Sequence, residues 1–208
     1  MYPWTIQTKL SKTICDEIVK QIEEDELYGP LKNARLIGNK HDTNVRKSGT
    51  VLFPATSWVA GMMAHYVNVA NKTFFNYELN NLWSHDKIQY ALYDKNAHYT
   101  WHFDDLRPAL EPIGNDRDKL PKVRDQVRKL SFSLQLSDPD DYEGGDMQLV
   151  NFLDSKVPEE EPRYKINPVP RNQGTIIVFP STMLHRVSPI TKGIRRSIVG
   201  WAMGPPLR

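Results

Sequence analysis

Apolar positions repeat with the period of a helix in the first part of the chain. In residues 10–27 an apolar side chain stands at every fourth position, at Leu10, Ile14, Ile18 and Ile22. This spacing predicts an amphipathic α-helix with Cys15 and Val19 beside its apolar face. Ser11 is placed to cap the helix, and the Gly-Pro pair at 29–30 follows its end. Cys15 is therefore interpreted as a small core residue rather than a reactive thiol.

A second helix is predicted over residues 58–75, beginning after Ser57. Its apolar and aromatic side chains recur at helical spacing on one face, at Trp58, Met62, His65 or Tyr66, and Val69. Methionine-rich and aromatic faces also occur at binding surfaces. We interpret this one as part of the core.

From about residue 76 the pattern changes to short alternating segments separated by turns, which is typical of β-strands. Strands are predicted at 87–93, 99–105, 129–137, 146–152, 175–180, 184–189 and 195–203. Helices followed by strands predict one α+β domain over residues 1–208. In this domain a helical layer at about 10–75 packs on a β-sandwich or barrel at about 76–203.

Polar connections separate these elements. Residues 39–50 form a polar link between the first two parts of the chain. Two further connections, 107–125 and 155–173, are charged and rich in proline, and neither has the pattern of a core segment. Each is interpreted either as a mobile lid or as a solvated insertion.

Composition narrows the function classes. The chain has 27 Lys and Arg against 25 Asp and Glu, for a net charge of +2, which argues against nucleic acid or an anionic membrane as a partner. Its single cysteine excludes an internal disulfide framework and a multi-cysteine zinc site, and predicts a reducing compartment. No stretch has the length of a membrane span, and the first ten residues lack the apolar core of a signal peptide. We expect a soluble protein of the cytoplasm.

Candidate chemistry begins in the stretch "HYTWHFDDL". If residues 99–105 form a strand, alternation sends His102 and Asp104 to one face, so that a nitrogen and a carboxylate oxygen can meet one ion. The same alternation sends Trp101 and Phe103 to the opposite face as core residues. A His-x-Asp pair arises often by chance, so the motif needs a third ligand.

His185 is the best candidate for that ligand, because it follows the apolar strand and turn "GTIIVFPSTML". His98 lies on the same strand face as His102 but roughly 13 Å away. The remaining histidines are interpreted as surface or packed side chains, at His41, His65 and His85. Two histidines and one carboxylate form the facial arrangement of non-haem Fe(II) oxygenases, which leaves positions open for cosubstrate and oxygen.

Oxygenases of this kind that use 2-oxoglutarate need a cation for the distal carboxylate of that molecule. Arg195 lies ten residues after His185, at the start of the last predicted strand. A turn at 188–193 would return the chain antiparallel to the His185 strand and bring the guanidinium beside the metal. An arginine fork binds a carboxylate at two points. Arg196 would point to the opposite face as a solvent-facing charge.

Longer motifs around these residues are similar to those of a known family. "LYDKNAHYTWHFDD" is similar to a Tyr-x-x-Gly-x-x-Tyr-x-x-His-x-Asp motif, and "LSFSLQLSDPDDYEGGDMQL" to a strand, Asp-Pro turn and Tyr-x-Gly-Gly hairpin. "GTIIVFPSTMLHRVSPITKGIRRSIVGW" is similar to a run of Phe-Pro-Ser, His-Arg-Val and Gly-x-Arg. Over about residues 88–201 the chain resembles the Fe(II)/2-oxoglutarate-dependent dioxygenases. Within them it resembles the prolyl 4-hydroxylase-like group, which includes bacterial and phage PKHD-type hydroxylases.

The resemblance implies a double-stranded β-helix (jelly-roll or cupin-like) core with N-terminal helices packed on one face. It implies an enzyme that uses Fe(II), 2-oxoglutarate and O2 to hydroxylate an unactivated C–H bond, with release of succinate and CO2. Ascorbate is a further candidate cofactor.

The same resemblance assigns roles to residues. His102, Asp104 and His185 would be the metal ligands, and Arg195 would bind the distal carboxylate. Tyr93 matches a tyrosine that hydrogen-bonds the cosubstrate, with core packing as the alternative. Ser197 is interpreted as an ordinary strand serine, although it could add a hydrogen bond.

The chain departs from the family motif at two positions. Asn96 replaces a glycine of the motif, and asparagine tolerates the left-handed conformation such a turn needs. Asp146 stands where the group commonly has glutamate, and has no assigned role.

The substrate is expected to be a peptidyl proline, a free amino acid or another small molecule. The rival functions are a jelly-roll metal-binding module without oxygenase activity and an oxygenase acting on nucleic acid. The second would use the basic run at 117–128, which Asp116, Asp118 and Asp125 largely neutralise.

Overall fold

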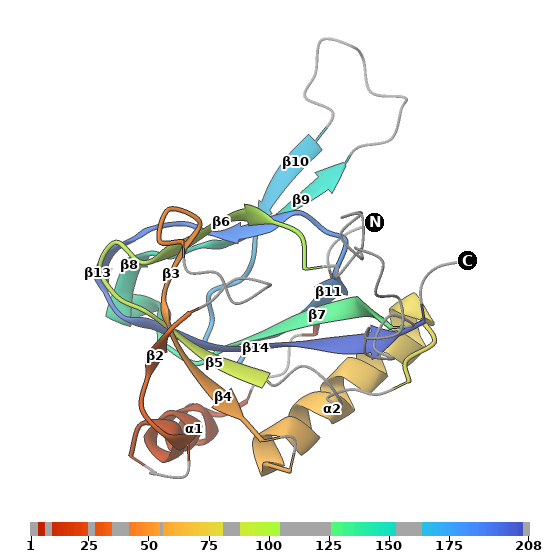
Figure 1. Cartoon of the computed structure of the whole chain (residues 1–208), viewed down its shortest axis with the longest axis horizontal. Helices are drawn as coiled ribbons and strands as arrows, with labels where there is room; N and C mark the ends of the chain where they lie inside the picture. Colours follow the sequence, from red (N-terminus) through yellow and green to blue (C-terminus); the bar gives the residue numbers. More distant parts are fainter. Residues whose placement is uncertain are drawn as a thin grey trace, which may run out of the picture.

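The structure is a computed structural model that describes residues 4–6, 10–24, 28–34, 42–54, 56–80, 88–104, 126–152 and 164–205. Two antiparallel sheets face each other, and two helices cover the outer face of the larger sheet (Figure 1). This arrangement is a double-stranded β-helix with helices on one face, as predicted.

The larger sheet has seven strands in the order β1-β11-β7-β14-β5-β4-β2. Their bounds are β1 Trp4–Ile6, β11 Ile176–Pro180, β7 Val127–Gln135, β14 Arg195–Gly204, β5 Ile88–Tyr93, β4 Gly49–Phe53 and β2 Lys32–Asn33. The central strands β7 and β14 are almost continuously buried, because one face contacts the helices and the other faces the second sheet.

The smaller sheet has five strands in the order β10-β9-β12-β6-β3. Their bounds are β10 Tyr164–Pro168, β9 Met147–Phe152, β12 His185–Val187, β6 His98–His102 and β3 Arg46–Lys47. A two-stranded ribbon, β13 Ile190–Gly193 with β8 Tyr142–Gly144, lies at one end of the two sheets (Figure 1). A 3-10 turn, Pro139–Asp141, leads into β8.

Helix α1 (Lys12–Glu24) confirms the first predicted helix, and the backbone N–H of Ile14 donates to Ser11 Oγ as a cap. Cys15 is fully buried, as expected, together with two isoleucines, Ile18 and Ile22. Ile14 was predicted on the buried face but is 38% exposed. A strict four-residue repeat turns about 40° per step away from a straight stripe on a helix of 3.6 residues per turn.

Helix α2 (Trp58–Ala70) continues into a π-helical turn, η3 (Asn71–Phe75), and Ser57 caps it by accepting from the Ala60 N–H. The predicted buried face was only partly right, because Met62 and Tyr66 are partly buried and pack against the core. The buried positions are Val59, Ala60, Met63, Val67 and Ala70, whereas Trp58 and Val69 are exposed. Small and β-branched residues let the helix lie close to the sheet, and the indole N–H of Trp58 is bonded to Gln21 Oε1 (2.8 Å) on the exposed side.

Strands β5, β6, β7, β9, β11, β12 and β14 confirm the seven predicted strands to within a few residues. Strands β1 to β4, β8, β10 and β13 were not predicted. The expected connection at 39–50 contains β3 and the first residues of β4, and the expected insertion at 155–173 contains β10. The connection at 107–125 lies outside the described residues. Phe103, expected in the core, is exposed, because β6 ends at the residue before it.

Three hydrophobic clusters hold these layers together. The largest lies between the helices and the larger sheet and includes Met63, Leu134 and Ile198. A second lies between the sheets, with Leu149, Ile177 and Phe179. A third surrounds the ribbon end of the molecule. No helix in the described ranges is long and apolar enough to cross a membrane.

Candidate functional site

Strand pairing places two histidines side by side on the smaller sheet. Strands β6 and β12 are antiparallel neighbours, and His185 stands directly opposite His102 in the ladder. Residues opposite each other in such a ladder point to the same face. The two imidazole centroids are 4.1 Å apart. Backbone hydrogen bonding therefore brings together two residues that are far apart in the sequence.

Asp104 follows two residues after the end of β6 and is held by both its backbone and its side chain. Its N–H donates to the Ser181 carbonyl (3.0 Å), and its Oδ2 accepts from Ser131 Oγ (2.8 Å). The hydroxyls of Ser131 and Ser181 are themselves 2.9 Å apart. The carboxylate is thus aimed at the histidines by contacts from the larger sheet and from the turn after β11.

The three side chains form a cluster that could hold a metal ion. Asp104 Oδ2 lies 3.2 Å from His185 Nε2, and Oδ1 lies 3.7 Å from His102 Nε2. One ligand atom from each residue lies within 4.8 Å of the other two. Each histidine places Nδ1 at a backbone carbonyl two residues earlier, Thr100 O (2.8 Å) and Met183 O (2.9 Å). This contact orients each ring so that Nε2 faces the carboxylate, as in metal sites.

Burial and mutual charge shift the pKa values within the cluster. Burial, and then the neighbouring His185, lower the pKa of His102 to about 3. Burial would raise the pKa of the Asp104 carboxyl, but His185, His102 and Arg128 hold it well below its usual range. Burial likewise opposes protonation of His185, but the Asp104 carboxylate raises the pKa of that imidazole. At neutral pH the cluster therefore offers a neutral His102 and an ionised Asp104, both competent to bind a cation.

Arg195 is a buried cation without a described acidic partner. It is the first residue of β14, pairs with Tyr93 of β5 in the ladder and is only 2% exposed. Its Nη2 donates to Gln135 Oε1 (2.8 Å) and its Nη1 to Ser197 Oγ (3.3 Å), and both acceptors are neutral. The Tyr93 ring centroid lies 5.4 Å from Cζ of the Arg195 guanidinium. A buried charge is costly unless it is paired, so this site is suited to an anionic ligand.

The route of the chain from His185 to Arg195 differs from the expected one. The two strands were predicted to be antiparallel neighbours, but β12 belongs to the smaller sheet and β14 to the larger. Between them β13 pairs with β8 and carries the chain from one sheet to the other. Gly193, with a φ of +74°, makes the turn into β14. The guanidinium therefore approaches from the opposite wall of the pocket.

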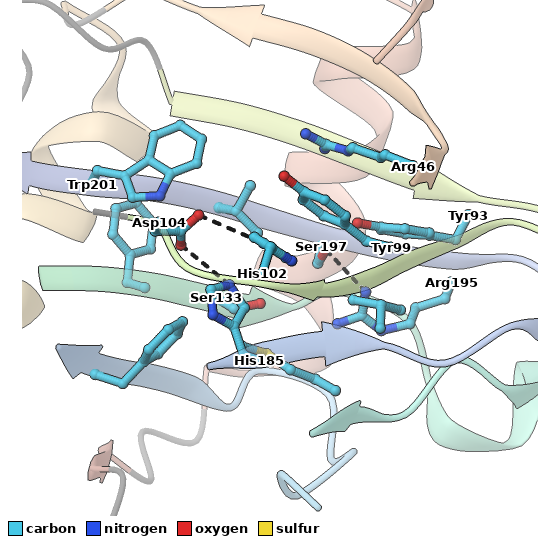
Figure 2. Close-up of a pocket in the computed structure, with 15 residues that line it drawn as sticks. Arg46, Tyr93, Tyr99, His102, Asp104, Ser133, His185, Arg195, Ser197 and Trp201 are labelled. Atoms are coloured by element: carbon cyan, nitrogen blue, oxygen red, sulfur yellow. Dashed lines mark hydrogen bonds and ion pairs between the residues drawn. The ribbon is translucent and has the colours of Figure 1, made fainter. Parts of the chain in front are cut away.

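One pocket contains the histidine–aspartate cluster and Arg195 (Figure 2). Its wall is mainly apolar and aromatic, with Phe132, Met147, Phe179, Val187, Val199 and Trp201, and its polar lining is Arg46, Tyr93, Tyr99, His102, Asp104, Ser133, His185, Arg195 and Ser197. All five residues singled out from the sequence as ligands of metal or cosubstrate lie in this lining. Ser197 also lies there and bonds Arg195, a more specific position than that of an ordinary strand serine.

Several residues in or beside the pocket were not singled out from the sequence. Ser133 lines the pocket, and Ser131 and Gln135, which lie outside the lining, bond Asp104 and Arg195. These three polar residues stand at alternate positions of the apolar run 130–136, and this alternation was an available signal. Arg46 lies in the segment expected to be a polar link, but it is buried and its guanidinium lies 4.8 Å from the Tyr99 ring centroid. Its position depends on the two-residue strand β3, for which the local pattern gives no indication.

Other residues considered from the sequence lie elsewhere. Arg196 is not simply solvent-facing, because its Nε lies 2.8 Å from Glu23 Oε1. Asn96 adopts φ +65°, which confirms the expected left-handed turn. Asp146 accepts from Arg171 Nη1 (3.3 Å). His65 and His98 do not line the pocket. His41, His85 and most of the basic run at 117–128 lie outside the described residues.

The fold and the cluster together define a double-stranded β-helix protein with a two-histidine, one-carboxylate site for a single metal ion. The model of the 2OG-Fe(II) oxygenase superfamily matches residues 88–203. The chain belongs to this superfamily. Fe(II) and 2-oxoglutarate are the cofactor and cosubstrate that define it, and the donor set and the buried Arg195 suit both.

Sequence relatives point to one branch of the family. A PKHD-type hydroxylase of Crocosphaera subtropica is 32% identical over 114 residues, 55% of this chain and 41% of that protein. A PKHD-type hydroxylase of Synechococcus sp. is 42% identical over 72 residues, 35% of this chain and 28% of that protein. The chain therefore matches less than half the length of these relatives.

Solved structures share the fold over nearly the whole chain. A prolyl hydroxylase from Trichoplax adhaerens, in complex with a hypoxia-inducible factor peptide fragment, has a TM-score of 0.68 at 17% identity, covering 96% of this chain and 82% of that one. A Pseudomonas putida prolyl-4-hydroxylase has a TM-score of 0.63 at 20% identity, covering 96% and 91%. These comparisons confirm the predicted double-stranded β-helix and the predicted prolyl 4-hydroxylase-like resemblance.

Proposed function

We propose that the protein is an Fe(II)- and 2-oxoglutarate-dependent hydroxylase that oxidises an unactivated C–H bond and releases succinate and CO2. Its substrate is a proline in a peptide, or a related amino acid. The observation that carries this proposal is the buried Arg195, which lies in the same pocket as the metal-binding cluster and has no described carboxylate partner. A structural metal site would not need such a cation.

The metal ligands in this proposal are His102, Asp104 and His185. Their support is the convergence of two Nε2 atoms and one carboxylate, with both rings oriented by backbone carbonyls. These three residues would hold the ion, and a two-histidine, one-carboxylate donor set would leave coordination positions open for the cosubstrate and oxygen. Ser131 holds the carboxylate in place through Oδ2.

Arg195 and Tyr93 bind the cosubstrate in this proposal. The guanidinium is fixed by Gln135 and Ser197, so it is oriented before a ligand arrives. Two-point recognition of a carboxylate by arginine favours a dicarboxylic keto acid over a monocarboxylic one. Tyr93 packs against the guanidinium and limits where the cosubstrate chain can lie.

Fe(II) and 2-oxoglutarate, when bound, would activate O2, which is the oxidant and supplies one oxygen atom to the hydroxylated product and one to succinate. The protein's part is to bind, orient and exclude water. Phe179, Val187 and Val199 give the pocket an apolar wall that limits water access. The negative charge of Asp104 and the nitrogen lone pair of His102 would bind the cation. Neither residue therefore acts as a proton donor in this scheme.

The substrate class rests on relatives and on the pocket wall. Prolyl hydroxylases share the fold, and one of them was solved with a peptide. Tyr99 and Trp201 line the pocket, and the guanidiniums of Arg46 and Arg128 lie 4.8 and 3.7 Å from their ring centroids. The aromatic rings can contact the ring of a proline, and the guanidiniums beside them can donate hydrogen bonds to the backbone carbonyls around it.

Anaerobic titration tests the proposal. Fe(II) is added first and 2-oxoglutarate second, and the visible charge-transfer absorption of the chelate is recorded. We expect an absorption band in the parent protein, no band in His102→Ala, and a far higher 2-oxoglutarate requirement in Arg195→Ala. Arg186→Ala is the matched control, because Arg186 lies on β12 against Trp101 and outside the pocket lining. Bound iron without a band in the parent would refute the oxygenase and favour a metal-binding module.

A further inference from the structure

Alternate residues of β7 form a polar row that faces the pocket. Ser131 donates to the Asp104 carboxylate at one end, and Gln135 accepts from Arg195 at the other. Ser133 lies two residues from each and also lines the pocket (Figure 2). Its hydroxyl is therefore positioned along the strand between the metal-binding cluster and the buried cation.

The Ser133 hydroxyl has no hydrogen-bond partner within the described ranges. The residue is only 1% exposed. Its neighbours across the ladder are Ile177 of β11 and Val199 of β14, whose side chains carry no polar atoms. A buried hydroxyl without a partner destabilises a fold, and such groups are rare in native proteins. Strand packing alone would therefore favour alanine or valine at this position.

We propose that Ser133 binds the 2-oxoglutarate cosubstrate by donating a hydrogen bond from Oγ to one of its carboxylates. This inference rests on the proposed function. A ligand held by the metal at one end and by Arg195 at the other passes the middle of the β7 row. Carboxylate oxygens accept hydrogen bonds from hydroxyls more strongly than neutral acceptors do. The pocket thus contains a binding residue whose partner arrives with the ligand.

Two measurements on one variant test this inference. In Ser133→Ala we expect the thermal midpoint of the ligand-free protein to equal or exceed that of the parent, because an unsatisfied group has been removed. We expect the 2-oxoglutarate Kd, from the anaerobic charge-transfer titration, to rise about tenfold, as for loss of one hydrogen bond to a charged group. Ser133→Cys keeps the size of the side chain but has a weak donor, so it should lose similar affinity.

Ser57→Ala is the matched control. Ser57 also carries a serine hydroxyl, but it caps α2 and lies outside the pocket lining. This variant should have a lower thermal midpoint and the same Kd as the parent. A Kd of Ser133→Ala within twofold of the parent would overturn the inference. So would a fall in its ligand-free midpoint as large as that of Ser57→Ala, because the hydroxyl would then have a partner within the fold.

Pyruvate identifies which carboxylate is bound, because it has the keto-acid end of 2-oxoglutarate without the distal carboxylate. An affinity loss in Ser133→Ala for both ligands assigns the bond to the metal end, and a loss for 2-oxoglutarate alone assigns it to the arginine end. Absence of the band in the parent would instead refute the proposed function, and the role of Ser133 with it. A parent that binds and a Ser133→Ala variant that binds equally well would refute only the role of Ser133.

Discussion

At the scale of single residues, a hydroxyl group of the larger sheet orients the Asp104 carboxylate, which lies beside the two histidines of the smaller sheet. The Ser131 hydroxyl donates to Asp104 Oδ2, and its oxygen lies 2.9 Å from Ser181 Oγ. Groups that orient metal ligands in this way typically change metal affinity by about 10- to 100-fold when they are removed. We therefore expect metal binding to depend on Ser131, although it is not one of the candidate ligands.

Ser131→Ala is expected to weaken divalent-metal binding by about 10- to 100-fold, because the Asp104 carboxylate loses a donor that fixes its orientation. Isothermal titration with Mn(II) measures this without oxygen sensitivity. Ser137→Ala is a suitable comparison, since the Ser137 hydroxyl bonds the backbone of residues 194 and 196 and lies outside the pocket lining. Equal metal affinity in Ser131→Ala and the parent would show that Asp104 needs no such support.

The residues of the pocket differ in how far the sequence predicts them. Motif spacing predicted that His102, Asp104 and His185 come together, but strand alternation does not explain the position of Asp104. Strand β6 ends at His102, and Ser181 and Ser131 hold Asp104 in place. Ser133 was not predicted as a pocket residue. A buried serine in an apolar strand is unremarkable until its neighbours, Ile177 and Val199, are known, and those come from strands distant in sequence.

At the scale of elements, the turn between β8 and β9 leaves little room for a side chain beside the stem of Arg195. Gly145 adopts φ +64°, and a Cβ there would lie 2.2 Å from Ile190 Cδ1 and 3.2 Å from Arg195 Cδ. Gly145→Ala should therefore destabilise the protein by roughly 1–3 kcal/mol through backbone strain and contact. It should also weaken cosubstrate binding by displacing the guanidinium.

The control for this glycine is Gly61 of α2, where an added Cβ meets nothing within 4 Å. Gly61→Ala should raise the thermal midpoint, because alanine favours a helix over glycine by about 1 kcal/mol. Thermal unfolding and cosubstrate titration of the two variants separate general stability from the effect on Arg195. If Gly145→Ala bound the cosubstrate like the parent, the turn would not position the arginine.

Polar contacts of Glu23 attach helix α1 to strands β5 and β14 of the larger sheet, in addition to apolar packing. Glu23 accepts from both Tyr90 and Arg196. Partial burial would raise the pKa of Glu23, but these two hydrogen bonds hold it below its usual value. A carboxyl with a lowered pKa in the folded state stabilises the fold above its unfolded pKa, and this contribution is lost as the pH falls through the folded pKa.

Glu23→Gln should therefore lower the thermal midpoint near pH 7, and the difference from the parent should shrink as the pH is lowered from about 5. The expected loss is about 1 kcal/mol or less, since the pair is partly exposed to solvent. Thermal unfolding from pH 3 to pH 7 measures it. Glu24→Gln, which changes the next and exposed residue, is the matched control. A constant difference over the whole range would rule out the charge as its cause.

Very short strands were the hardest elements to predict, although the five-residue β4 and β10 were missed as well. The seven strands predicted from alternation are all present, whereas the two-residue strands β2 and β3 are too short to have a pattern. The buried face of α2 was misassigned because its apolar residues surround the helix, so spacing alone does not distinguish Trp58 from Val59. In both cases long-range contacts determine the structure, namely the pairing of the short strands and the face of α2 that is buried. Such contacts are not a local property of the sequence.

At the scale of the whole molecule, three hydrophobic clusters hold the layers of the fold together. The candidate metal ligands are not members of these apolar clusters, although the His185 ring lies 4.9 Å from that of Phe179. Chelator-treated protein should therefore keep its far-ultraviolet circular dichroism. Added Fe(II) or Mn(II) at 100 times its Kd should stabilise it by about 2.7 kcal/mol through mass action. Differential scanning calorimetry would show a midpoint higher by roughly 5–10 °C, and unfolding on chelation would instead indicate a structural metal.

The placement of the pocket walls on separate sheets has a mechanical consequence. His102 and His185 belong to the smaller sheet and Arg195 to the larger, so a dicarboxylate anchored at both ends would act as a removable cross-link between the layers. In hydrogen–deuterium exchange, loaded protein should show slower exchange in β6 and β12 together with the start of β14. Metal alone would protect the first two. The cosubstrate would then govern how far the sandwich can open, and with it the access of a bulky substrate to the pocket.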